Sequence, residues 1–201
     1  MKSMNNKELF KIFAEFSKIQ VNKSLNALDM IYNEISNGFD REFEEIKKMK
    51  FKTPPDDDEI YFYLRNREGE SFLGTEVFGQ YMIVATYSLF EKALKHIFSW
   101  TNKLSENEIK FCYKDQNLKK ILENKFGIDY QTLNKSAEIA ELRFLNNCIK
   151  HDGKVNNDLA QSNNKWQENQ PIESVYDDFR RLKDTPIQFL TDLINKIENQ
   201  L

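Results

Sequence analysis

The feature that most constrains the fold is a stretch of helical periodicity that starts at Lys7 and continues to about Lys50. Apolar residues recur there every three or four positions, with charged residues on the opposite face. The series includes Leu25, Leu28, Tyr32, Ile35, Phe39, Phe43 and Ile46. This spacing predicts one long helix, or two helices that meet near Asn37 and Gly38.

Few residues in the chain break helices. Only 6 Gly and 4 Pro occur among 201 residues, fewer than turn-rich β architectures normally need. Hydrophobic residues make up 40% of the chain, which is enough for one core of ordinary size. We therefore expect an all-α protein, folded as a single domain over residues 1–201.

Local signals place the remaining elements. A loop is expected at Thr53–Asp58, because its prolines cannot continue a helix. Residues 60–74 suggest a short helix plus a loop. The further expected elements are a helix from Thr75 to about Asn102, a helical region from the Ser105–Glu108 capping box to a stop at Gly127, a helix from Ser136 to His151 ended by Gly153, a polar connection over 154–170, a helix from Pro171 to about Lys183, and a last helix from Thr185.

The net charge is −3 and the isoelectric point is near 5.6, which argues against a general polyanion binder. No apolar run approaches the roughly 20 residues that span a bilayer, and the N-terminus lacks the apolar region of a secretory signal. We expect a cytoplasmic protein with no membrane partner.

The sequence predicts neither a cofactor nor a metal. Cys112 and Cys148 are expected as free thiols of a reducing compartment. Together with His96 and His151 they form no closely spaced pair of zinc ligands. His96 is expected to be a partly buried helix histidine with a hydrogen-bond partner.

The most informative chemistry lies on the helix that ends at His151. Arg143, Asn147 and His151 are spaced four residues apart, which places them in an arc of about 80° on one helix face. Ile139, Leu142, Leu145 and Ile149 lie on another side and anchor the helix in the core. A cationic His151 beside Arg143 and Lys150 would suit a phosphate. The alternative is that His151 is only a cation at a helix C-terminus.

This segment resembles the signature of the HEPN superfamily, in which an Arg and an Asn precede a His that is followed by Asn or Asp and Gly. The corresponding string is Asn146-Asn147-Cys148-Ile149-Lys150-His151-Asp152-Gly153. Asn147 and His151 match the family pattern, whereas Asn146 stands where the family has Arg. Arg143, almost one turn earlier, is a candidate to supply the guanidinium. Glu91 resembles the acidic residue of the central helix that faces the signature helix, and the resemblance covers about residues 75–153.

The resemblance implies a HEPN-like up-and-down helical bundle with a long N-terminal helix and a C-terminal helical extension. It implies a homodimer that brings two signature helices together, and a metal-independent endoribonuclease of a toxin-antitoxin or antiviral defence system. His151 would transfer protons, with Arg143, Asn146 and Asn147 completing the catalytic set and Lys150, Lys154 and Glu91 contacting the RNA. A cognate antitoxin or effector protein would be the partner.

Two other functions stay open. One is a catalytically inactive HEPN module that dimerises or binds nucleic acid beside another effector, which the missing Arg at position 146 favours. The other is a structural helical interaction protein in which His151 merely ends a helix.

Overall fold

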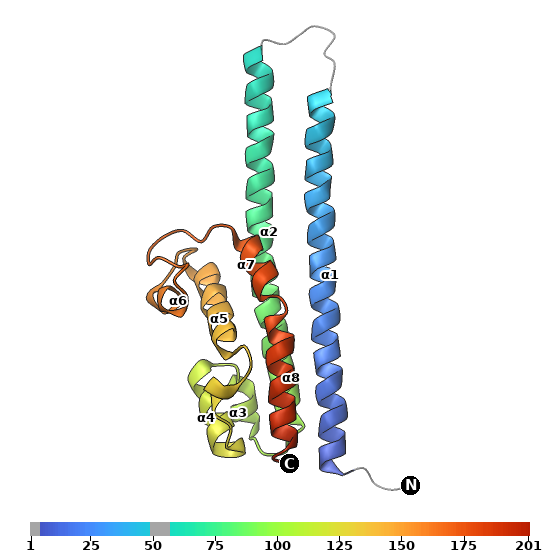
Figure 1. The fold of residues 1–201 in the computed structure, drawn as a ribbon, viewed down its shortest axis with the longest axis vertical. Coiled ribbons are helices and arrows are strands. Elements are labelled where there is room, and N and C mark those ends of the chain that lie inside the picture. The colour runs from blue at the N-terminus through green and yellow to red at the C-terminus, as the bar shows by residue number, and fades with distance from the viewer. Residues whose placement is uncertain (1–4, 49–56) are drawn as a thin grey trace.

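The computed structural model describes residues 5–48 and 57–201, and its largest feature is a hairpin of two long helices, α1 (Asn6–Lys48) and α2 (Asp57–Ser99) (Figure 1). One long α1 is therefore the correct alternative for the N-terminal segment. Its start is fixed by reciprocal hydrogen bonds between Asn5 and Glu8, of 2.8 and 3.0 Å. The buried side chains of α1 follow helical spacing at Phe10, Ala14, Val21, Leu25 and Tyr32.

α2 is continuous from Asp57 to Ser99, so the prediction of a short helix plus a loop over residues 60–74 is wrong. Gly69 lies inside α2, where a glycine costs only about 1 kcal/mol relative to alanine and does not by itself end a helix. The expected break at Thr53–Asp58 falls mainly on residues 49–56, which lie outside the described residues. Asp57 already belongs to α2.

Shorter helices pack against the lower part of this hairpin (Figure 1). They are α3 (Glu106–Phe111), α4 (Asp115–Phe126), the 3-10 turn η1 (Tyr130–Thr132) and α5 (Ser136–His151). The predicted capping box is confirmed, because Ser105 and Glu108 bond each other's backbone amides. Gly127 and Gly153 take positive φ angles of 65° and 64° after α4 and α5, which confirms both predicted stops.

The C-terminal part contributes α6 (Asn157–Ser162), α7 (Val175–Leu182) and α8 (Thr185–Glu198). The predicted polar connection over 154–170 thus contains a short helix. Pro171 does not begin a helix, because it forms an antiparallel bridge with Lys154 and α7 starts only at Val175. The last helix begins at Thr185 as expected, with Pro186 in its first turn.

Within the described ranges the chain is all-α, and its buried apolar side chains form one connected cluster. Members such as Phe90 of α2, Leu142 of α5 and Phe189 of α8 are at most 1% exposed. Among the described residues, no helix is both long enough and apolar enough to cross a bilayer. α5 lies on one side of α2 and α1 on the other (Figure 1), so the two helices present separate surfaces.

Candidate functional site

The C-terminal end of α5 is held in place by the segment that precedes α7. The backbone amide of Gly153 donates to Cys148 at 2.9 Å and closes the helix. The Gly153 carbonyl accepts from Ile172 at 3.0 Å, and Val155 exchanges backbone bonds with Asn169 and Gln170 at 2.8 and 2.9 Å. These bonds fix the positions of His151 and Lys154 although both lie at a helix end.

Four of the predicted site residues are exposed at this end of the molecule: Asn147, Lys150, His151 and Lys154. The imidazole of His151 makes no hydrogen bond or ion pair with any described residue. Its two nitrogens are therefore open to an external group. Lys150 and His151 also sit in the last turn of α5, where the helix dipole favours cationic side chains.

Arg143 does not join this exposed group. Its side chain is 15% exposed, and the guanidinium lies 3.4 Å from the carboxylate of Asp115 and 4.5 Å from the Phe144 ring centroid. Burial lowers the pKa of Arg143, against the opposing influence of Tyr87 and Asp158. Two helical turns, about 12 Å of rise, separate Arg143 from His151. Of the expected exposed stripe, only Asn147 and His151 are present at the surface.

Asn146, at the position of the family's Arg, is buried with 2% exposure. Its Nδ2 donates to Oδ1 of Asn147 at 3.3 Å, and its own Oδ1 has no partner among the described residues. A buried amide with an unsatisfied acceptor costs stability. This position therefore offers no guanidinium to a ligand and no room for a long exposed side chain.

Glu91 lies on α2, and Lys150 of α5 acts on its charge. Burial raises the pKa of the half-buried Glu91 carboxyl, whereas the charges of Lys95 and Lys150 lower it. Lys150 is thus within electrostatic reach of Glu91 across the α2–α5 contact. The carboxylate offsets part of the positive charge that Lys150 would offer to a phosphate.

His96 has the hydrogen-bond partners that were predicted, although it is exposed rather than partly buried. Nε1 of Trp100 donates to its Nε2 at 3.3 Å, so the imidazole proton resides on Nδ1, which contacts the Ser17 hydroxyl. Ser17 in turn donates to the Phe13 carbonyl at 2.9 Å. This chain of bonds links α1 to α2, and its serine hydroxyl is already engaged by its own helix.

The cysteines are free, as expected, and both are buried. Burial raises the pKa of Cys112 to about 12 and also raises the pKa of Cys148. Within residues 5–48 and 57–201, no three His, Cys, Asp or Glu side chains gather in a way that could hold a metal ion.

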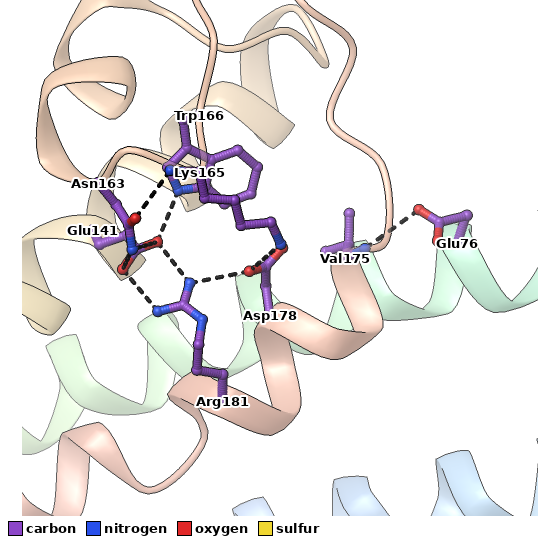
Figure 2. Close-up of polar contacts among 8 residues, drawn as sticks. All are labelled: Glu76, Glu141, Asn163, Lys165, Trp166, Val175, Asp178 and Arg181. Atoms are coloured by element: carbon purple, nitrogen blue, oxygen red, sulfur yellow. Dashed lines mark hydrogen bonds and ion pairs between the residues drawn. The ribbon is translucent and has the colours of Figure 1, made fainter.

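A buried ionic network that was not anticipated from the sequence lies elsewhere on α5 (Figure 2). Glu141, 3% exposed, accepts hydrogen bonds from Arg181, from Trp166 at 2.8 Å and from Asn163 at 3.4 Å. Arg181 and Lys165 both contact the fully buried Asp178. Figure 2 shows these groups turned toward one another, so the network is a structural tie between α5, α7 and the connection before α7. The one sign of this network in the sequence is Glu141 itself, an acidic residue on the buried side of α5.

No protein-family model, curated protein or solved structure matches this chain.

Proposed function

We propose that the chain is a HEPN-type helical module that binds RNA through the exposed end of α5 without cleaving it, and that it acts beside a separate effector protein. The observation that carries this proposal is the burial of Asn146 at the position where the family has its Arg. Cleavage needs a cation that stabilises the charge of the phosphorane-like transition state. Asn146 cannot supply it, and Arg143 is engaged with Asp115.

The RNA-binding surface consists of Asn147, Lys150, His151 and Lys154. Lys150 and Lys154 provide charge for phosphate oxygens, while Asn147 and His151 provide hydrogen-bonding groups. With only two lysines in the group and a net charge of −3, binding should be modest and strongly weakened by salt. Such weak, local binding suits a subunit that relies on an effector for the rest of its affinity.

A second function, the endoribonuclease, is favoured by one observation: the imidazole of His151 is exposed and unpaired within the described residues. In a homodimer with two facing signature helices, one His151 would take the proton of the ribose 2′-OH while the 2′-oxygen attacks phosphorus. The second His151 would protonate the departing 5′-oxygen, which leaves a 2′,3′-cyclic phosphate. A toxin-antitoxin or antiviral role would follow from this activity.

One experiment separates the two functions. Binding of a fluorescently labelled single-stranded RNA is measured by anisotropy in EDTA, and the same RNA is then analysed on a denaturing gel. We expect binding by the wild type, an intact RNA, and at least about tenfold weaker binding by the double variant Lys150→Glu and Lys154→Glu. Lys120→Glu, which reverses an exposed charge on α4, is the matched control and should bind as wild type does.

The other outcomes of this experiment would contradict the proposal. Metal-independent cleavage that disappears in His151→Ala and persists in His96→Ala would establish the nuclease instead. Equal binding by the wild type and the double variant, or no binding at low salt, would rule out the α5 surface as an RNA site.

A further inference from the structure

α1 carries a second set of apolar side chains on the face that is turned away from the core. Five residues of this set are about half exposed or more: Ile12, Phe16, Ile19, Met30 and Ile31. At 100° per residue they fall in an arc of about 120°, which is separate from the arc of buried residues such as Val21 and Leu25. A helix with two apolar faces is typical of one that packs against partners on both sides.

This face adjoins a shallow groove between α1 and α2. Two neighbouring hollows of about 400 and 490 Å³ form the groove, and both are lined by Ser24, Leu89 and Lys92. Small side chains of both helices, including Ala27 and Ala85, also line it. A helix backbone can therefore approach closely, as it does in helix-in-groove recognition.

Three charged residues border this surface, and none of them makes an ion pair or hydrogen bond within the described ranges: Lys23, Glu34 and Lys92. Lys23 and Glu34 lie on the exposed apolar face of α1, separated by about 16 Å of helix rise. Lys92 of α2 lines the same hollow as Gln20 of α1. Because Gln20 and Lys23 are about one helical turn apart on α1, Lys92 and Lys23 lie near the same end of the groove. The surface thus has an unpaired acid at one end and two unpaired lysines at the other.

We propose that a second copy of this chain occupies the groove, with the two α1 helices antiparallel about a two-fold axis near residues 28 and 29. This axis brings Glu34 of each copy to Lys23 and Lys92 of the other, while Ala27 and Met30 meet at the centre. A parallel pairing would instead place Lys23 beside its own equivalent, which is unfavourable. Charge complementarity therefore selects both the partner and the direction of pairing.

This interface does not depend on the proposed function, and it has a consequence for it. α1 and α5 lie on opposite sides of α2 (Figure 1), so a dimer formed through α1 keeps the two α5 surfaces apart. Two His151 side chains would then not share one site. Each copy would offer its own α5 surface to RNA.

The test is sedimentation velocity of the full chain over about 1–100 µM. We expect a concentration-dependent dimer. Glu34→Lys should raise its dissociation constant at least about tenfold, because it creates like-charge contacts at two equivalent places. The triple exchange of Lys23→Glu, Lys92→Glu and Glu34→Lys restores every proposed pair with reversed sign. It should return the dissociation constant to within about threefold of wild type.

Glu168→Lys is the control, because Glu168 is an exposed acid in the connection before α7 and makes no ion pair with any described residue. It should leave the dimer unchanged. A chain that stays monomeric over this range overturns the proposal. So does a dimer that is insensitive to Glu34→Lys, or one that the triple exchange fails to restore.

Discussion

The carboxylate of Glu141 accepts hydrogen bonds from both terminal amino groups of Arg181, at 2.9 and 2.6 Å, and so joins α5 to α7. The pair is asymmetric, because the Glu141 side chain is 3% exposed whereas that of Arg181 is 39% exposed. Burial removes the Glu141 carboxylate from the water that would solvate it, so its charge is compensated by Arg181 instead. Because α7 follows the segment that fixes Gly153 and Lys154, this ion pair also supports the end of α5.

Removal of the guanidinium should destabilise the protein. We expect Arg181→Met to lower the free energy of unfolding by about 2 kcal/mol, less than a fully buried pair because Trp166 still donates to Glu141 and Arg181 is partly exposed. Urea denaturation measures the change. Arg180→Met is the control, because the exposed guanidinium of Arg180 lies 5.8 Å from the ring centroid of Tyr176 and makes only this ring contact among the interactions of the described residues. This variant should lower the free energy of unfolding by less than about 1 kcal/mol. Equal losses in the two variants would contradict the assigned role of Glu141.

The same pair should make stability depend on pH. Burial alone would raise the pKa of Glu141, but hydrogen bonds from Arg181, Trp166 and Asn163 outweigh it, so the pKa lies below its usual value. A carboxyl with a lowered folded-state pKa contributes its full stability above the unfolded value of about 4.3, and loses it as the pH falls through the folded value. The stability difference between wild type and Glu141→Gln should therefore be largest near pH 7 and shrink below about pH 4. Urea titrations of both proteins from pH 7 to pH 3 provide the comparison, and a constant difference would refute the explanation.

Features encoded by neighbouring residues were predictable, and features set by distant partners were not. The Ser105 capping box, the glycine stops and the extent of α5 depend on residues a few positions apart, and all were anticipated. Pro171 was misassigned because its pairing with Lys154 overrides a local preference for a helix start. The Glu141 network was missed because Arg181 lies 40 residues away. For the site, the sequence pattern placed Asn147 and His151 on the surface. It did not reveal that Asn146 is buried or that Arg143 contacts Asp115 of α4, because both depend on the tertiary packing of α5.

Two glycines of α2 should respond to alanine in opposite directions. A Cβ at Gly79 would lie 2.9 Å from the backbone nitrogen of Tyr176, where α7 crosses α2, so Gly79→Ala should destabilise by about 1–3 kcal/mol. A Cβ at Gly69 meets nothing within 4 Å, so Gly69→Ala should stabilise by about 0.5–1 kcal/mol through helix propensity. Thermal unfolding followed by circular dichroism measures both. A midpoint raised by Gly79→Ala would contradict the close approach of α7 to α2, and a midpoint lowered by Gly69→Ala would contradict the helix-propensity argument.

The final prediction concerns the amide oxygen of Asn146. Because Oδ1 of Asn146 is buried and has no partner among the residues that the structure describes, Asn146→Leu should leave stability unchanged or raise it by up to about 1 kcal/mol. Asn146→Arg should destabilise the protein, because it forces a charge into a 2% exposed position. Urea denaturation ranks the two variants, and Asn124→Leu at an exposed position of α4 is the control for loss of an amide. If the anisotropy assay then showed unchanged RNA binding by Asn146→Leu, position 146 would be excluded from the binding surface. A large loss of stability in Asn146→Leu would instead mean that the amide oxygen is satisfied in solution, and that this residue has a structural role in holding α5 to the core.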